Sequence, residues 1–313
     1  MRIPFDLGPA ASRPFDVVGL GQNSVDQLAV VAEFPRGNTK HRIEQFARLP
    51  GGQVASAMVC CARLGWRARY VGRFGDDELG RFGLASLDEE GVDASAAQTV
   101  AARTRSAIVL VDGRSGDRTV LWDRDPALAL RPGDIADEVW HSGRVLHVDC
   151  EDIAAATGAA RAARAGGALT VIDVEAVLPG VPALLRHIDV IVASEGFPEK
   201  LTGHKDTGSA LAAMAREYSP AVACVTLGAA GSLAMCQGRE FRTPAFDVPV
   251  VDSTGAGDAF RGGFIAGYLQ AGAEADVSDV LTFATAVAAL KCRLLGARAG
   301  LPRPADVEQF LRR

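Results

Sequence analysis

The residues best suited to chemistry lie at positions 250–269, VVDSTGAGDAFRGGFIAGYL. An apolar, strand-like segment leads through a glycine-containing turn into a helical pattern. The backbone N–H groups of Ala256, Gly257 and Asp258 should therefore point to one place, at the positive end of a helix dipole. Because Gly255 and Gly257 keep the turn free of bulky side chains, a phosphate could approach these amides closely. The pattern predicts an anion-binding site.

Asp258 is an unexpected residue in such a site, because its carboxylate would repel a bound phosphate. It is well placed as a general base, which accepts a proton from a substrate hydroxyl while that oxygen attacks phosphorus. The alternative is an acidic residue in the first helical turn that only interacts with the helix dipole. Spacing alone leaves both interpretations open.

The composition is that of an ordinary globular protein and excludes several classes of partner. The chain has 313 residues, 48% hydrophobic and 23% charged, with a formal net charge of −5. This balance argues against nucleic-acid binding, and no apolar run reaches the roughly 18 residues that span a membrane. The six cysteines form no C-x-x-C pair and lie mostly in apolar segments, which indicates reduced, buried thiols. We expect a cytoplasmic protein with a loose N-terminal tail over residues 1–15.

Strand-like and helix-like segments alternate along most of the chain, which is typical of a parallel sheet covered by helices on both faces. Helices are expected at 52–64 and 256–270, each with one apolar face. Buried strands are expected at 15–21, 67–74, 144–150, 168–174, 188–194 and 221–228.

Two segments, 25–48 and 96–124, interrupt this alternation. The second contains RTRSAIVLVDGRSGDRTVLW, which predicts a hairpin that turns between Asp112 and Asp117. We expect both segments to form a small β-sheet lid inserted into one domain that spans residues 1–313. Since such a lid exposes a face and its edges, it favours a homodimer.

The segment DSTGAGDAF resembles the C-terminal signature of the ribokinase-like, or PfkB, family of carbohydrate kinases. The segment GGQVASAMVCCARLGWRARYVGRFGDDELG, residues 51–80, resembles the N-terminal signature of the same family. The resemblance covers residues 15–312. It implies a three-layer α/β/α core with a mainly parallel central sheet and a β lid, and a kinase that transfers the γ-phosphoryl group of ATP, with Mg²⁺, to a sugar hydroxyl.

The resemblance also implies roles for individual residues. Asp258 corresponds to the catalytic base, Gly255, Ala256 and Gly257 to the anion hole, and Asp26 to the carboxylate that binds sugar hydroxyls. The glycine pair and the helix after it add further candidates for sugar contact, namely Gly51, Gly52, Gln53 and Ser56. Many relatives have Asn where Ser56 stands, so this contact is altered.

On the nucleotide side, the segment CVTLGAAGSL at 224–233 resembles the family's strand and turn, with Thr226, Gly228 and Gly231. Relatives commonly have Asn-x-x-Glu for magnesium and phosphate where this chain has Ser194 and Phe197, and Glu195 is a neighbouring substitute. Asp252 and Thr254, with backbone carbonyls from residues 291–300, match a monovalent-cation site found in some members, for which potassium is suited.

The charge of the sugar is open at this stage. The lid segments contribute several cations, among them Arg105, which could bind a phosphate or sulfonate group on the sugar. The segment AALKCRLLGARAGLP is similar to sulfofructose kinases, but it belongs to the nucleotide side. A neutral ketose or aldose is the leading expectation, and an anionic sugar or a nucleoside is the alternative.

Other classes of protein fit less well. The segment GLGQNS at 19–24 lacks the third glycine of a dinucleotide fingerprint, and no P-loop motif occurs. A sugar sensor without catalysis on the same fold remains an alternative, but a pure binder has no evident need of Asp258.

Overall fold

A twisted sheet of eight strands forms the centre of the protein. The computed structural model describes residues 1–8, 13–114 and 118–312. The strands lie in the order β14-β13-β12-β11-β10-β9-β1-β4. Their bounds are β1 Phe15–Leu20, β4 Ala68–Val71, β9 Gly143–Val148, β10 Leu169–Val174, β11 Val190–Ser194, β12 Val222–Thr226, β13 Ser232–Cys236 and β14 Arg239–Thr243. The six from β4 to β12 pair in parallel, and β13 and β14 continue the sheet antiparallel.

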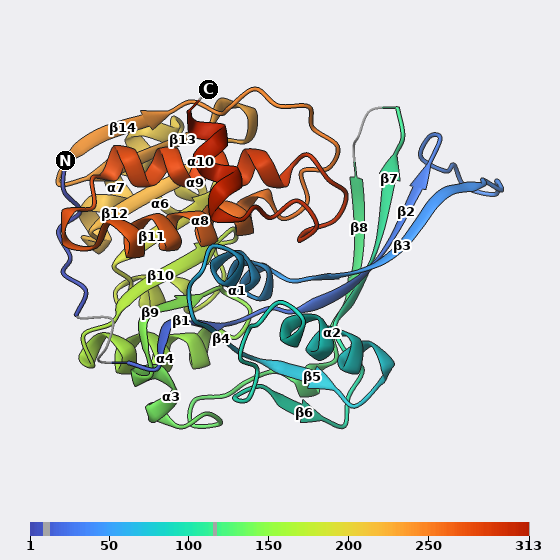
Figure 1. Ribbon diagram of the computed structural model, residues 1–313, viewed down its shortest axis with the longest axis horizontal. Coiled ribbons are helices and arrows are strands. Elements are labelled where there is room, and N and C mark those ends of the chain that lie inside the picture. The colour runs from blue at the N-terminus through green and yellow to red at the C-terminus, as the bar shows by residue number, and fades with distance from the viewer. Residues whose placement is uncertain (9–12, 115–117, 313) are drawn as a thin grey trace.

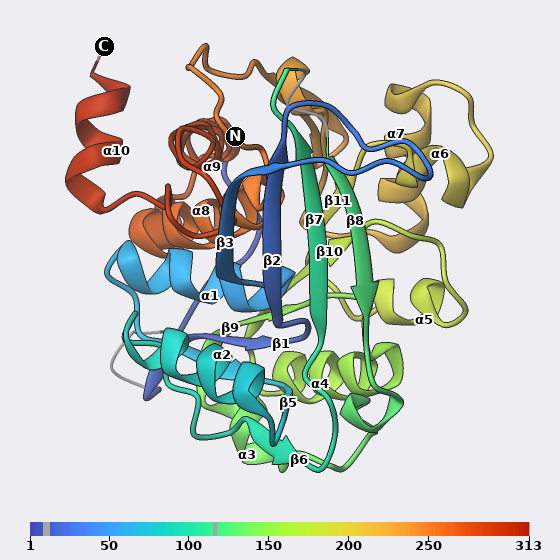
Figure 2. The same ribbon diagram turned by 90° about the vertical axis from the view of Figure 1, so that its right-hand side faces the viewer.

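Helices cover both faces of this sheet, as Figures 1 and 2 show. Residues from α1, α8, α9 and α10 share one apolar cluster with the sheet, and residues from α3 to α7 share a second cluster on the other face. The first group comprises α1 Gln53–Arg63, α8 Ala256–Ala271, α9 Val277–Lys291 and α10 Pro304–Leu311. The second comprises α3 Asp137–His141, α4 Ile153–Ala165, α5 Val181–Leu185, α6 Phe197–Thr202 and α7 Thr207–Tyr218. The predicted three-layer α/β/α fold is confirmed.

A separate four-stranded sheet, the lid, extends away from this body to the right in Figure 1. Its order is β3-β2-β7-β8, with β2 Ser24–Val31, β3 Ile43–Gly51, β7 Ser106–Asp112 and β8 Arg118–Asp123. Alternation of the side chains gives the lid two faces. The inner face carries Leu28 and Val109, which are buried, whereas the outer face carries Phe46 and Leu121, which are exposed.

Several local expectations need correction. The segment 67–74 is two strands rather than one, because Gly72 separates β4 from β5 (Arg73–Gly75). Strand β5 pairs with β6 (Gln98–Val100) beside α2 (Glu78–Asp88), so the start of the 96–124 segment lies outside the lid. The turn expected up to Asp117 lies partly outside the described residues.

Helix α8 is buried on all sides from Ala259 to Leu269, not on one apolar face. The first eight residues are packed rather than loose, since Ile3 is buried and its N–H donates to the carbonyl of Ala275 at 2.9 Å. Within the described ranges, no helix combines the length and apolar character needed to cross a membrane.

Candidate active site

The residues predicted to form an anion hole, Gly255 to Asp258, lie at the start of α8. Gly255 precedes the helix with φ 77°, and a Cβ there would lie 2.8 Å from Cα of Ala297. Only glycine therefore fits both the left-handed conformation and the close approach of the 291–300 loop. The N–H of Ala256 already donates to the carbonyl of Ser253 at 3.1 Å. The amides of Gly257 and Asp258 follow in the first turn, where N–H groups have no acceptor within the helix.

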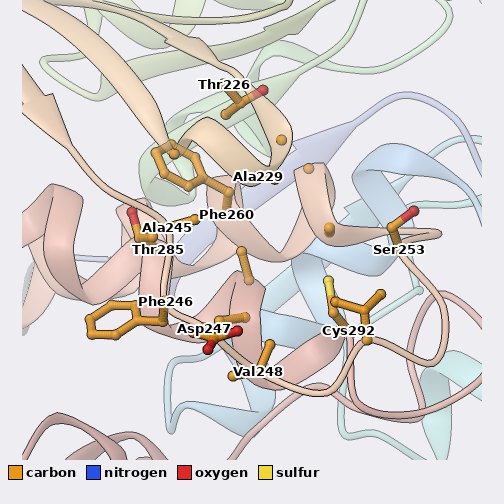
Figure 3. A pocket seen from close by; sticks show the side chains of 17 residues that line it. Thr226, Ala229, Ala245, Phe246, Asp247, Val248, Ser253, Phe260, Thr285 and Cys292 are labelled. Atoms are coloured by element: carbon orange, nitrogen blue, oxygen red, sulfur yellow. The ribbon is translucent and has the colours of Figure 1, made fainter.

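A cavity of about 610 Å³ lies on one side of this turn (Figure 3). Its lining includes the predicted nucleotide residues Thr226, Gly228 and Gly231, together with Phe246 and Phe260. Gly231 needs to be glycine, because a Cβ there would lie 2.0 Å from the carbonyl oxygen of Thr243. The mixture of apolar walls and a helix N-terminus suits a nucleotide, whose base is apolar and whose phosphates are anionic.

A second cavity of about 390 Å³ lies between the turn and the inner face of the lid. Predicted sugar-site residues line it, namely Asp26, Gly52, Gln53 and Arg105. Asp258 and Ser194 also face it, as do Val120 and Trp122 from the lid. The two cavities share Thr226, Ser253 and Gly257. A phosphoryl donor in the first cavity and an alcohol acceptor in the second would therefore meet at the start of α8. Asp258 lines the second cavity.

Burial raises the pKa of Asp258 to about 6, although the charges of Arg261, Arg298 and Lys291 act in the opposite direction. The carboxyl group is therefore mostly ionised at neutral pH, yet more basic than an ordinary aspartate. A general base works best when its pKa lies near the working pH. The electrostatics fit the role expected of Asp258.

Asp26 lines the second cavity and lies against Gly51. A Cβ on Gly51 would lie 2.3 Å from Oδ2 of Asp26, so a glycine is required for this contact. The hydroxyl of Ser24 donates to Oδ1 of Asp26. Burial raises the pKa of Asp26, whereas this hydrogen bond lowers it. The carboxylate is thus oriented toward the cavity and leaves acceptor capacity for sugar hydroxyls.

Two side chains from the start of α1 are placed differently. Gln53 lines the cavity and its amide donates to Glu175 at 3.2 Å. Ser56 is fully buried and does not line the cavity, because its hydroxyl accepts a hydrogen bond from Arg298 Nε at 3.3 Å. Arg298 also donates to the carbonyl of Gly51 at 2.7 Å. Ser56 therefore contributes to the support of the glycine pair.

The charge of Arg105 is paired inside the protein. Its Nη1 lies 3.1 Å from Oε2 of Glu151, and its guanidinium lies over the ring of Trp122. Glu151 also pairs with Arg124, which in turn pairs with Asp152. These lid-side cations thus have carboxylate partners already.

Arg261 is the site residue that the sequence analysis missed. One turn after Asp258, it is 2% exposed and lines the second cavity. Its Nη2 lies 2.6 Å from Oδ1 of Asp173 and 3.5 Å from the hydroxyl of Ser194. Arg261 thus lies beside Ser194, the residue that stands where the family pattern predicts Asn. Phe197 is buried in the opposite core, and Glu195 is exposed and lines neither cavity.

The residues expected to hold a monovalent cation surround a lysine. Lys291, the last residue of α9, donates from Nζ to the backbone carbonyl of Asp252 at 2.7 Å. The two carboxylate oxygens of Asp252 accept the N–H groups of Thr254 at 2.8 Å and Gly296 at 2.7 Å. The sequence analysis assigned no role to the side chain of Lys291, because only the tertiary structure brings it to the carbonyl of Asp252.

Comparison with known proteins agrees with this fold. The pattern of the family described as pfkB family carbohydrate kinase matches residues 15–304. A fructokinase from Klebsiella pneumoniae is 31% identical over 304 residues, covering 90% of this chain and 97% of that protein. Fructokinase-1 from Oryza sativa subsp. japonica is 29% identical over 328 residues, covering 96% of this chain and 99% of that protein.

Solved structures share the fold. The crystal structure of a protein assigned as a ribokinase from Agrobacterium tumefaciens has a TM-score of 0.88 at 28% identity, covering 95% of this chain and 97% of that one. Ribokinase from Arabidopsis thaliana, solved with ribose and ATP, has a TM-score of 0.83 at 23% identity, covering 95% and 98%. The family match and the fructokinase relatives indicate a sugar kinase, which is a phosphotransferase that acts on an alcohol group. The chain belongs to the pfkB family of carbohydrate kinases.

Proposed function

We propose that the protein transfers the γ-phosphoryl group of ATP to a hydroxyl of a neutral sugar of the fructose or ribose type, with Asp258 as the general base. One observation carries this proposal. The two cavities meet at Ser253 and Gly257, and Asp258 faces the cavity that also contains Asp26.

In this mechanism Asp26 binds sugar hydroxyls and orients the acceptor toward the start of α8. Asp258 accepts the proton of the attacking hydroxyl, and the N–H groups of Gly257 and Asp258 stabilise negative charge on the transferring group. Gly255 allows this turn to approach the phosphates. Strand β8 of the lid covers the second cavity and would exclude water from it. Arg118 of this strand donates to the hydroxyl of Ser253 at 2.7 Å.

Magnesium is expected to enter with ATP, since it prefers oxygen ligands and keeps several waters. The chain lacks the Asn-x-x-Glu pair at 194–197. Glu175, however, lines the second cavity, its charge acts on Asp258, and its Oε2 accepts a hydrogen bond from Gln53. Glu175 is the residue that we assign to hold the hydrated ion. When bound, the ion would neutralise charge on the phosphates.

The pairing of Arg105 with Glu151 favours a neutral acceptor over a phosphorylated or sulfonated sugar. An anionic group would have to displace a carboxylate partner at 3.1 Å before it could use this cation. The rest of the lining carries charges of both signs. Arg261 is paired with Asp173, and Arg118 donates to the hydroxyl of Ser253. The carboxylate of Asp26 suits hydroxyl donors. The fructokinase relatives agree with a neutral ketose.

We further propose that residues 1–313 act as one kinase domain in a homodimer that pairs through the outer face of the lid. Phe46 and Leu121 are each 57% exposed on that face, and Ile108 lies beside them in the lid sheet. A reducing, cytoplasmic setting fits the cysteines, which are free, with Cys60, Cys61 and Cys224 fully buried.

The proposal is tested by measuring ADP release from Mg-ATP with fructose, ribose, their phosphates, sulfofructose and nucleosides. We expect turnover with a neutral ketose or aldose and little with the anionic sugars. Turnover that appears only with an anionic sugar or a nucleoside would refute the acceptor class. Turnover with none of them, combined with a melting temperature raised by sugar, would indicate a sensor.

A further inference from the structure

A buried cation from the end of α9 contacts the segment that leads into α8. Lys291 is 0% exposed, and its Nζ donates to the carbonyl of Asp252, six residues before Asp258 in the sequence. A buried ammonium group needs both hydrogen bonds and a counter-charge, because its desolvation is costly. Asp252 supplies both, through its carbonyl and through the charge of its carboxylate.

The oxygens that would bind a monovalent cation here are already engaged. The carbonyl of Asp252 accepts Lys291, and its carboxylate oxygens accept the N–H groups of Thr254 and Gly296. The carbonyl of Cys292 accepts two backbone N–H groups, from Val251 at 2.8 Å and from Asp252 at 3.1 Å. A potassium ion would have to compete with these hydrogen bonds for its oxygen ligands, so the residues fit the ion less well than the sequence predicted.

Charge repulsion adds a second objection to a metal ion. Potassium bound to the carbonyl of Asp252 would lie next to an ammonium nitrogen that is 2.7 Å from the same oxygen. Two unit charges about 4 Å apart repel by roughly 4 kcal/mol at the effective dielectric of a protein surface, and more in the interior. The lysine and the ion are therefore alternatives for one position.

The position of Lys291 explains what its charge does. Its ammonium charge acts on Asp258 and, with Arg261 and Arg298, opposes the effect of burial on that carboxyl. The same charge contacts the carbonyl of Asp252, three residues before Gly255, in the segment that leads to the first turn of α8. In the proposed mechanism, phosphate charge is stabilised at that turn. A cation bound between Asp252 and the 291–300 loop would have the same electrostatic effect.

We propose that Lys291 is a built-in replacement for a monovalent cation, so that this kinase works without potassium. The rate measurement that tests this inference rests on the proposed function, whereas the melting temperatures and the crystal measurement do not. Because the charge is attached to the chain, it is present at every turnover and needs no ion from solution. The wild-type enzyme should then show the same rate in potassium as in a large organic cation.

The experiment compares potassium, sodium and tetramethylammonium chlorides at the same ionic strength, about 0.1 M. It uses the wild type, Lys291→Ser, and Lys205→Ser, which removes an exposed lysine on the α6–α7 side, as the control. For the wild type and the control, we expect equal rates and equal melting temperatures in all three salts. Lys291→Ser should lose about 10²-fold in rate in tetramethylammonium, and potassium should restore part of that loss.

Two measurements need no sugar and so separate this inference from the proposed function. The melting temperature of Lys291→Ser should rise with potassium, and rubidium should give an anomalous peak at Asp252 in crystals of that variant only. A rate or melting temperature of the wild type that rises with potassium would overturn the proposal, as would a rubidium peak in its crystals. Full activity of Lys291→Ser in tetramethylammonium would overturn it as well. If Lys291→Ser does not fold, the wild-type salt comparison decides alone.

Discussion

The guanidinium of Arg261 and the carboxylate of Asp173 form a buried ion pair, with Nη2 2.6 Å from Oδ1. The pair connects α8 to strand β10, and both residues line the second cavity. Arg261 also donates to the carbonyl of Val192 at 3.2 Å, which fixes it from β11. A buried cation is therefore held one helical turn from Asp258, beside the hydroxyl of Ser194.

Replacing Arg261 with Met should change the pH dependence of the reaction as well as the stability. The charge of Arg261 holds down the pKa of Asp258, which is about 6. A base must be ionised to act, so activity falls as the pH drops below its pKa. In the wild type, kcat/KM should be half-maximal near pH 6 on the acid side, and in Arg261→Met this limb should move to higher pH.

The same substitution leaves the carboxyl group of Asp173 buried without its cation. Burial already raises the pKa of Asp173 to about 7 with Arg261 present, so this carboxyl should take up a proton in the variant. The unfolding free energy should therefore fall by less than the roughly 3–5 kcal/mol lost when a buried charge stays unpaired. Chemical denaturation measures this loss, and Arg216→Met, at an exposed arginine on α7, serves as the control. An acid limb unchanged in Arg261→Met would mean that Arg261 has a structural role only.

Gly51→Ala should weaken sugar binding and leave nucleotide binding intact. The added Cβ would lie 2.3 Å from Oδ2 of Asp26, so the carboxylate must move from the position in which it binds hydroxyls. We expect KM for the sugar to rise about tenfold or more, equivalent to roughly 1.4 kcal/mol. KM for ATP should stay near the wild-type value.

Gly158→Ala is the matched control for this change. Gly158 lies inside α4, and a Cβ there meets no atom within 4 Å. Alanine in a helix interior stabilises by about 0.5–1 kcal/mol relative to glycine, so this variant should keep both KM values and melt slightly higher. Equal sugar KM values in the two variants would contradict the role of Asp26.

Leu121→Glu should convert the proposed dimer to a monomer, because it places a charge in the apolar outer face of the lid. Sedimentation should give twice the chain mass of 32.7 kDa for the wild type and a single chain mass for the variant. Val177→Glu, a similar change at an exposed valine outside the lid, should remain dimeric. A monomeric wild type at micromolar concentration would refute the lid interface.

Local patterns and the two signatures were enough to predict the parallel strands of the central sheet, and most of the predicted site residues line the two cavities. Strands β1, β9, β10, β11 and β12 are short apolar runs, and Gly255 and Asp258 lie in one continuous motif. The additional strands β13 and β14 were not predicted, because they form an antiparallel extension that departs from the βα alternation.

The buried cations could not be predicted in the same way. Arg261 and Lys291 look like ordinary polar residues within helices, and their partners Asp173 and Asp252 are far away in the sequence. Ser56 illustrates the opposite case. Its place in the signature suggests sugar contact, but the side chain is covered by Arg298, which arrives from the other end of the chain.

The most direct test of the account is the turnover of Asp258→Asn with Mg-ATP and the best acceptor sugar. Asparagine keeps the size and the helix position of the side chain but cannot accept the proton. We predict that kcat falls by about 10²–10⁴-fold, while the melting temperature and the affinities for ATP and sugar stay close to those of the wild type. A kcat within a few-fold of the wild type, measured on a variant that binds both substrates, would contradict the role of Asp258 as the base.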